Sequence, residues 1–407
     1  MADATYMKDI KVNEMTNSGE GWYLSEEEWL LKQNVRELVE KEIAPRFKEN
    51  KSEETADKFY KEAMKKLGEA GFLRAWGPEK LGCYGMRPTV LGIIAEEVAR
   101  GNGAIAIHAL ENPLVGIRMA SASPAAWEKH GEDILNGAFI LAGATCAPEG
   151  QVNYAEQADI ATFDEETQEW VLNGEKAFCS GGTFCDYLRI AGLYKGELYQ
   201  WSMYPNHPGL TIHHNPEVGC SPTSASVTMK NVRIPKEFGG PTGQVKDRVA
   251  LPGSAMSCLF HTCVGCMAIG SAEAALDKTI EYLKHRTSNF KPIASLGQIQ
   301  YKLVDMKAKL EAARCLTYTA LHMIETNYKD AVLYSHLAKT FTCDTARWIT
   351  AECVQMHGNV GANPDSGVAQ HMMDAVVYGI GTGTSDMHIN SAAHEMGLPE
   401  SDNKIYY

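Results

Sequence analysis

Residues 377–385 read Val-Tyr-Gly-Ile-Gly-Thr-Gly-Thr-Ser, a short glycine-rich stretch near the end of a chain of 407 residues. Within it, Gly381 and Thr382 stand directly before Gly383 and Thr384. The hydroxyl of Thr382 cannot act as a general base near neutral pH, whereas a desolvated carboxylate can. What this stretch implies depends on the segments before it, which alternate between two kinds of secondary structure.

The N-terminal third of the sequence predicts helices. Ser25 and Glu28 form a capping box, with the serine at the N-cap and the glutamate three residues later. Apolar residues then recur at helical spacing until Pro45 ends the pattern. Further apolar stretches from Val90 to Val98 and from Ile105 to Leu110 extend the helical character of this part of the chain.

The middle of the sequence, from about Phe139, predicts short strands separated by turns. Asn173-Gly174 lies between two strand-like runs, which is a signal for a hairpin. Other β-branched or aromatic runs and five prolines divide the region into short pieces; the runs are residues 187–191 and 226–229.

The C-terminal part returns to long helices rich in Ala, Leu and Lys, over residues 268–283, 298–325 and 331–356. The fold class is therefore α+β, with an all-α segment (1–140), a small antiparallel β domain (141–245) and a second all-α segment (246–407). A chain of 407 residues is longer than one hydrophobic core normally supports. A doubly wound nucleotide fold is disfavoured because no GxGxxG turn follows a strand.

Composition excludes several classes of function. The formal charge is -13 with no long Lys/Arg cluster, which argues against nucleic acid or an anionic membrane as the main partner. The sequence contains no run of about 18 consecutive apolar residues, so no membrane span is predicted. The N-terminus has no basic region followed by an apolar one, so no secretory signal is predicted. The eleven cysteines predict reduced thiols in a cytoplasmic protein, and Cys263 and Cys266 are expected to be buried rather than to bind zinc.

Two stretches carry a resemblance to a known family. Residues 377–385 resemble the C-terminal motif of the acyl-CoA dehydrogenases, in which Tyr-Glu precedes Gly-Thr and the glutamate removes the substrate's α-proton. Residues 172–182, Leu-Asn-Gly-Glu-Lys-Ala-Phe-Cys-Ser-Gly-Gly, are similar to the strand that covers the flavin in that family. The resemblance runs from about Leu24 to Ala393, and Thr382 stands where the glutamate is expected.

The resemblance implies an N-terminal α-helical domain, a middle antiparallel β domain and a C-terminal four-helix domain that together bind FAD. Phe178 stands where a tryptophan covers the flavin ring, and Ser180 where a hydroxyl meets flavin N5. Read from the residues alone, Phe178 is equally a buried strand residue, and Arg286 an exposed charge at a helix end. The full set of cofactor-binding residues that the resemblance implies is Cys146, Phe178, Ser180, Arg286, Phe290, Gln298, Gln355, Gly358, Thr384 and Asp386.

The usual base is missing, so the resemblance leaves three candidates and one supporting group. Glu111 follows a long apolar run, and a carboxyl group placed there has a raised pKa; the alternative is a solvated glutamate at a helix end. His261 lies on the helix that lines the acyl pocket and is either a base or a satisfied pocket histidine. Glu149 is an acid beside the acyl channel. The backbone N–H of Thr382 is expected to polarise the substrate carbonyl.

The function implied is FAD-dependent dehydrogenation of an acyl-CoA thioester, with a cyclic, branched or dicarboxylic acyl group and electrons passed to an electron-transferring flavoprotein. The family suggests a homo-oligomer, a dimer of dimers. Alternatives are a base-lacking subunit of a hetero-oligomer with a sister chain, other flavin chemistry on the same fold, and a flavin-free scaffold.

Overall fold

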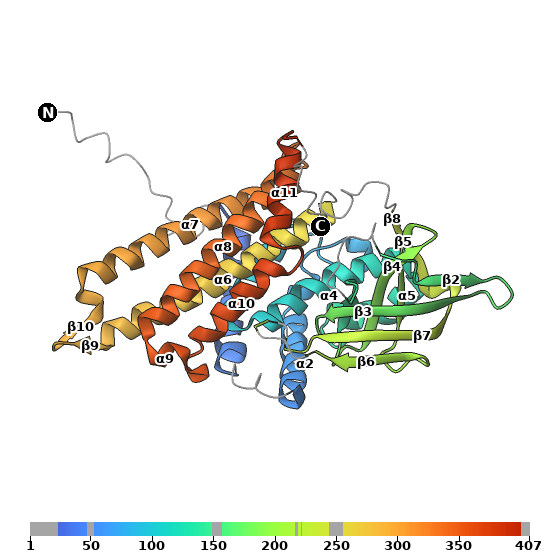
Figure 1. Ribbon diagram of the computed structural model, residues 1–407, viewed down its shortest axis with the longest axis horizontal. Coiled ribbons are helices and arrows are strands. Elements are labelled where there is room, and N and C mark those ends of the chain that lie inside the picture. The colour runs from blue at the N-terminus through green and yellow to red at the C-terminus, as the bar shows by residue number, and fades with distance from the viewer. Residues whose placement is uncertain are drawn as a thin grey trace.

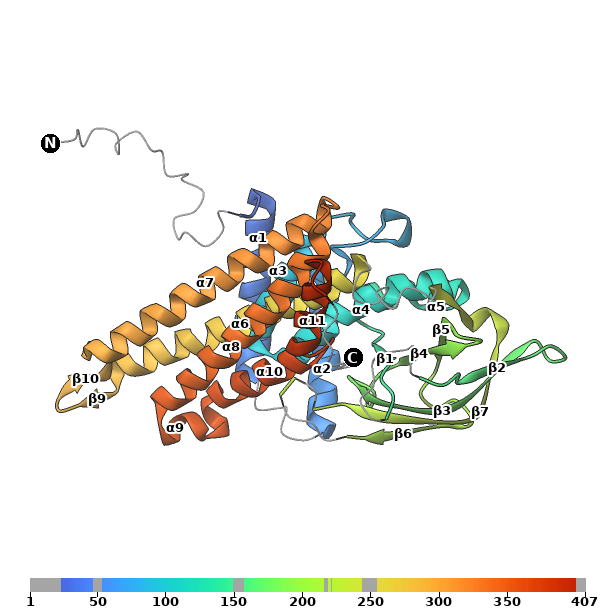
Figure 2. The same ribbon diagram turned by 45° about the horizontal axis from the view of Figure 1, so that its top comes forward.

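The structure of the protein is a computed structural model. It describes residues 23–46, 53–148, 157–215, 219–220, 222–243 and 255–399. Long helices from the C-terminal part lie at one end of the molecule, and two four-stranded sheets lie at the other (Figure 1). The N-terminal helices pack between these two parts (Figures 1 and 2). The order of elements is therefore α, then β, then α, as the sequence predicts.

The N-terminal part is helical because its apolar residues recur every three to four positions and face a common core. The predicted capping box is confirmed: Ser25 Oγ accepts from Glu28 N at 3.3 Å, and Glu28 Oε2 accepts from Ser25 N at 2.8 Å. The helices of this part are α1 (Glu26–Leu38), α2 (Glu53–Glu69), α3 (Thr89–Gly101), α4 (Gly103–Ala122) and α5 (Pro124–Leu135).

The β part consists of two four-stranded sheets, in the orders β1-β4-β5-β8 and β2-β3-β7-β6. Their facing sides enclose an apolar core that includes the fully buried Leu172, Ile190, Trp201 and Val227. All pairings in these sheets are antiparallel except that of β1 with β4. The strands are β1 (Leu141–Ala144), β2 (Ala161–Asp164), β3 (Glu169–Cys179), β4 (Tyr187–Tyr194), β5 (Glu197–Met203), β6 (Leu210–His214), β7 (Ala225–Pro235) and β8 (Gly239–Gly243).

The hairpin predicted at Asn173-Gly174 is wrong. Strand β3 continues through both residues, and its register against β7 shifts between Leu172 and Gly174. Gly174 has φ +133°, so it supplies the backbone freedom that a β-bulge requires rather than a turn. The turn between β2 and β3 lies instead at residues 165–168.

The C-terminal helices form a bundle around α6, whose stretch from Cys258 to Leu276 is almost entirely buried. The stretch Met256–His285 is long and apolar enough to cross a membrane, but 94% of its most apolar window is buried inside the protein, as expected for the central helix of a bundle. Cys263 and Cys266 are buried free thiols within it, as predicted. The elements are α6 (Ala255–His285), β9 (Thr287–Ser288), β10 (Lys291–Pro292), α7 (Gly297–Glu325), α8 (Ala331–His357), α9 (Asn359–Ala362), α10 (Val368–Ile380) and α11 (Ser385–Glu395).

A buried ionic network joins the N-terminal helices to this bundle. Glu96 on α3 accepts from Lys32 Nζ at 2.7 Å and from Tyr318 Oη at 2.7 Å. Arg314 on α7 donates to Glu96 at 3.3 Å and to Glu273 on α6 at 2.9 Å. The nearby cations hold the pKa of Glu273 below its ordinary value, against the effect of burial. The network therefore fixes α1 and α3 against α6 and α7.

We predict that Arg314→Met destabilises the protein by about 3–5 kcal/mol, because removing one partner of a buried ion pair leaves an uncompensated charge. The measurement is urea unfolding of the FAD-loaded protein. Lys58→Met is the matched control, since Lys58 is 79% exposed and lies 4.0 Å from Glu62. Equal stability of the two variants would contradict a structural role for the network.

Candidate functional site

Phe178 lies near the end of β3, where the strand departs from regular pairing with β7. The register shifts between Lys176 and Cys179, and Phe178 adopts a left-handed φ of 55°. Aromatic residues rarely take this conformation, and such strain is concentrated at functional sites. The side chain is 49% exposed, so the alternative of a buried strand phenylalanine is wrong and an open aromatic face is present.

Cys146 and Ser180 lie close to Phe178. Cys146 O accepts from Ala177 N at 3.0 Å, which places the residue after β1 beside the end of β3. Ser180 directly follows β3 and is partly exposed. The structure therefore brings together three predicted cofactor residues at one edge of the β part.

The loop after Ser180 packs tightly against helix α4. A Cβ atom added to Gly181, which has φ +70°, would lie 2.4 Å from Cε1 of His108. One turn further along α4, Glu111 Oε2 is 4.0 Å from His108 Nδ1. Glu111 thus projects from α4 next to the edge that carries Phe178 and Ser180.

Glu111 lies in the middle of α4, so the alternative of a solvated helix-end glutamate is wrong. Its side chain is 16% exposed, and among the described residues its Oε2 atom is buried without a hydrogen-bond partner. Burial raises the pKa of Glu111 to about 7, although the charge of Arg189 opposes the rise. A carboxyl group with a pKa near neutrality is suited to accept a proton.

Helix α4 holds Glu111 in place through its neighbour Asn112, which is fully buried. The amide of Asn112 donates to Ile134 O at 3.2 Å and Phe139 O at 3.0 Å, and its Oδ1 accepts from Leu141 N at 2.8 Å. These bonds fix the helix against the start of β1. The nitrogen and the oxygen of the Asn112 side chain both have hydrogen-bond partners, so the position of Glu111 relative to the strands is well determined.

Thr382 lies in the loop between α10 and α11 with a left-handed φ of 59°. Its Oγ1 is buried and has no hydrogen-bond partner within the described residues, and its carbonyl oxygen lies 3.2 Å from His388 Nε2. Thr384 caps α11 by accepting from Met387 N at 3.3 Å, and the exposed Asp386 lies in the first turn. A non-glycine residue held in this conformation is a second strained position at a predicted site.

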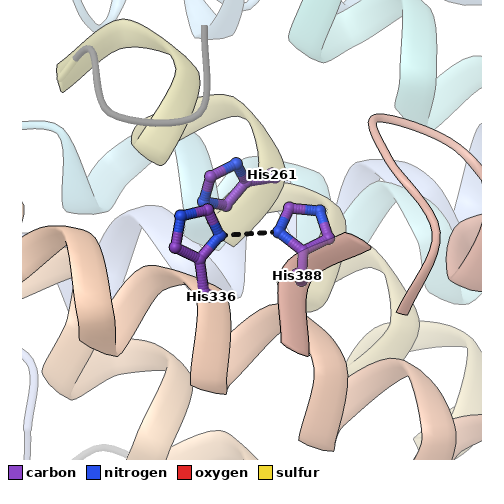
Figure 3. A group of neighbouring side chains, drawn as sticks. All are labelled: His261, His336 and His388. Atoms are coloured by element: carbon purple, nitrogen blue, oxygen red, sulfur yellow. Dashed lines mark hydrogen bonds between the residues drawn. The ribbon is translucent and has the colours of Figure 1, made fainter. Parts of the chain in front are cut away.

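His261 is brought to the same loop through two other histidines (Figure 3). Its Nε2 lies 2.9 Å from Ser335 Oγ, and its ring packs against those of His336 and His388 with centroids 5.1 and 4.6 Å away. Burial, with smaller effects of the neighbouring histidines and Lys339, holds the pKa of His261 well below its ordinary value. An imidazole of such low pKa is a weaker base near neutral pH than Glu111.

The remaining predicted cofactor residues lie at the far end of the helix bundle. The β9–β10 hairpin and α9 lie at the end farthest from the strands in both views (Figures 1 and 2). The ends of α6 and α8 meet there, since the rings of Tyr282 and His357 stack at 4.4 Å. Exposed residues gather at this end, and they are Arg286, Phe290, Gln298, Gln355 and Gly358.

Sequence reasoning did not identify Arg189, His336 or His388 as members of the site. Arg189 on β4 has its Nε buried without a partner within the described segments. No local spacing connects any of these residues to Glu111 or His261. Contacts between elements distant in the sequence bring them together, because α4 packs against the sheet that contains β4, and α6 and α11 both pack against α8. The third candidate base, Glu149, lies outside the described residues.

These features fit FAD, which contains a flat ring system and a pyrophosphate. Phe178 offers an aromatic face beside partly exposed Ser180 and Cys146. Arg286 has an exposed guanidinium whose Nη1 donates only to Thr287 O, at 2.8 Å, so its fork has further donors for phosphate oxygens.

Comparison with known families identifies the class of protein. The model described as "Acyl-CoA dehydrogenase, N-terminal domain" matches residues 25–133, and "Acyl-CoA dehydrogenase, C-terminal domain" matches residues 255–397. Together they cover most of the chain, which belongs to the acyl-CoA dehydrogenase family, FAD-dependent oxidoreductases that act on CH–CH bonds.

Similar proteins cover nearly the whole chain. A 3-(aryl)acrylate reductase of Clostridium sporogenes is 28% identical over 90% of this chain and 97% of its own. A cyclohex-1-ene-1-carbonyl-CoA dehydrogenase of Geobacter metallireducens is 27% identical over 90% of this chain and 96% of its own. The solved butyryl-CoA dehydrogenase of Megasphaera elsdenii aligns with a TM-score of 0.80 at 24% identity, over 92% of this chain and 98% of its own.

The raised pKa of Glu111 predicts a specific dependence of stability on pH. A carboxyl group whose pKa is about 7 when folded and ordinary when unfolded costs stability as pH rises, because folding then opposes ionisation. The cost is absent below the ordinary pKa and complete above about pH 7. We therefore expect Glu111→Gln to raise the thermal midpoint relative to wild type at pH 8 but much less at pH 5.

The control for this measurement is Glu128→Gln, because Glu128 is exposed on α5. That substitution should leave the difference between the two pH values unchanged. A stability gain of Glu111→Gln that is the same at pH 5 and pH 8 would show that the carboxyl group is not held protonated by its surroundings.

Proposed function

We propose that this protein dehydrogenates a cyclic or otherwise bulky acyl-CoA thioester and that Glu111 is the base that removes the α-proton. The supporting observation is the carboxyl group of Glu111, whose buried Oε2 has no hydrogen-bond partner among the described residues and whose pKa is about 7. It lies beside the end of β3, next to Phe178 and Ser180. FAD supplies the hydride acceptor in this reaction. The resemblance to cyclohex-1-ene-1-carbonyl-CoA dehydrogenases supports a cyclic acyl group.

Each protein group has a separate task in the proposed reaction. Glu111 takes the proton from the α-carbon. Its low exposure to solvent keeps water away from the negative charge that then develops on the substrate. The backbone N–H of Thr382 polarises the thioester carbonyl and so stabilises negative charge on its oxygen. When FAD is bound, Phe178 would cover the cofactor ring, and the hydroxyl of Ser180, directly after β3, would donate to it. His261, with its low pKa, supports the Thr382 loop rather than accepting the proton.

The two groups of predicted cofactor residues support a dimer. Cys146, Phe178 and Ser180 lie at the β part, whereas Arg286, Gln298 and Gln355 lie at the opposite end of the bundle (Figure 1). One FAD bound within a single chain would not span both groups. We propose that Arg286 and its neighbours hold the adenylate half of a cofactor bound mainly by a second copy, in a dimer of dimers.

The partners follow from the proposed chemistry. Reduced FAD must be reoxidised, and we propose an electron-transferring flavoprotein as the acceptor. A relative from Acetobacterium woodii, described as a subunit of a caffeyl-CoA reductase-Etf complex, is 28% identical over 90% of this chain and 97% of its own. The absence of disulfide bonds among the described cysteines supports a cytoplasmic location.

The opposite direction of the same reaction is the second candidate. Two relatives are described as reductases, acting on 3-(aryl)acrylate and on caffeyl-CoA. Because the reaction is reversible, the same carboxyl group would then deliver the proton to the α-carbon of an unsaturated thioester. Its pKa of about 7 suits either role.

The experiment that tests the proposal is anaerobic titration of the FAD-loaded protein with straight, branched, cyclic, aromatic and dicarboxylic acyl-CoAs, followed by flavin absorbance. We expect bleaching by cyclic acyl-CoAs, and a loss of about 100-fold or more in its rate for Glu111→Gln. Glu128→Gln is the control and should bleach at the wild-type rate. If no thioester bleaches the flavin, a base-lacking subunit that needs a sister chain becomes the better account.

Arg286 is proposed to contact the FAD that is bound mainly by a second copy of the chain. Arg286→Ala should lower the FAD content of the purified protein, because the guanidinium is a phosphate ligand. The matched control is Lys284→Ala, a neighbouring exposed cation that lies 3.5 Å from Glu281. FAD affinity, measured by fluorescence after removal of the cofactor, distinguishes the two; equal affinities would exclude Arg286 from the site.

A further inference from the structure

Three histidines from three helices converge in the interior behind the Thr382 loop. His261 comes from α6, His336 from α8 and His388 from α11, and all three are buried (Figure 3). One nitrogen of each ring lies within 4.8 Å of one nitrogen of each of the other two. His336 Nδ1 and His388 Nδ1 are closest, at 2.8 Å. Such convergence of imidazoles is uncommon unless the rings share a ligand.

The outer contacts of two rings determine where their protons lie. His388 Nε2 is 3.2 Å from Thr382 O, and a carbonyl oxygen can only accept, so this nitrogen carries the hydrogen. Ser335 Oγ donates to Val332 O at 2.7 Å, so the 2.9 Å contact with His261 Nε2 is made by a hydrogen on that ring. In both neutral rings Nδ1 therefore carries a lone pair, and that of His388 accepts the hydrogen of His336 Nδ1 at 2.8 Å.

This pattern is typical of metal-binding histidines, which donate their second ring N–H to a backbone carbonyl or another oxygen and are thereby oriented. His336 adds a further unsatisfied atom, because its Nε2 is buried without a hydrogen-bond partner among the described residues. A buried polar atom without a partner is costly. A metal ion held by this nitrogen and by one nitrogen of each of the other two rings would remove that cost.

We propose that His261, His336 and His388 bind a divalent transition-metal ion, with zinc as the first ion to test. Three imidazoles without a carboxylate among the described neighbours suit zinc, cobalt or nickel rather than magnesium or calcium. Tetrahedral zinc with three nitrogen ligands at about 2.0 Å separates them by roughly 3.3 Å, so ring nitrogens that lie within 4.8 Å of one another need to shift by no more than about 1.5 Å to bind one ion. The fourth position is left for water.

The site has a route to solvent and a link to the loop. His336 is among the residues that line a surface groove over α8 and α11, beside Leu337, Phe341 and Ile389, so an ion has an entry path. The N–H of His388 meets the carbonyl of Thr382, so an ion on His388 would fix the loop that carries the proposed carbonyl-polarising group. The ion is thus structural.

Lys339 provides an independent test of the proposed metal site. Its ammonium group, buried on α8, donates to Gly383 O at 3.0 Å and acts electrostatically on both His261 and His388. A positive charge at this place opposes a bound cation. Replacing Lys339 by the uncharged Met should therefore tighten metal binding, whereas a change that only disturbed packing would weaken it.

The test is metal binding by the FAD-loaded protein after dialysis against a chelator. Zinc is titrated calorimetrically, and cobalt serves as a spectroscopic probe through its visible absorption. We expect one ion per chain, a higher thermal midpoint with zinc, binding weakened about 100-fold or more in His336→Gln, and tighter binding in Lys339→Met. His371→Gln is the control, because His371 is buried on α10 and bonded to Lys278 at 2.9 Å, outside the cluster.

FAD content and circular dichroism establish that each variant is folded, and His388→Gln replaces His336→Gln if the latter is not. Absence of stoichiometric binding in the wild type would overturn the proposal, as would equal affinities of the wild type and a folded ligand variant. Neither readout depends on turnover, so the outcome is independent of the role proposed for Glu111.

Discussion

The buried ionic network around Glu96 and Glu273 is the constraint on which the arrangement of the helices depends. Two carboxylates in the interior require cations at fixed positions, and those cations come from different parts of the chain. Lys32 belongs to α1, and Arg314 to α7. Helix α3 is thereby held against α6 and α7, and α4, which directly follows α3, is carried to the strands. The network thus determines where Glu111 lies, although it does not touch it.

The β part fixes the other half of the site. The strained backbone at Phe178 persists because β7 pairs with β3 before and after the register shift, and a bridge from Cys146 holds the adjacent Ala177. Thr382 shows the same principle, because helices α10 and α11 hold a left-handed residue between them. The proposed site therefore combines two strained residues and a carboxyl group from three separate supports, and no single segment determines its geometry.

The sequence predicted the order of elements well because periodicity is a local property. The predicted helices over 298–325 and 331–356 agree within one residue with α7 and α8 at each end. The hairpin at Asn173-Gly174 was wrong because pairing on both sides of β3 outweighed the local turn signal and converted Gly174 into a bulge. Glu111 was identified as a candidate from its apolar surroundings, whereas Arg189, His336 and His388 were not, since their significance arises only from contacts between distant segments.

The central claim is that Glu111 is the acid–base group for the α-carbon, and it is tested most directly by exchange of the α-hydrogen with solvent. A cyclic acyl-CoA is incubated anaerobically in D₂O with wild-type protein or Glu111→Gln, and deuterium at the α-carbon is measured by NMR. The account predicts incorporation with the wild type and its loss with the variant while FAD remains bound. Equal incorporation by both proteins would contradict it and would place the base elsewhere.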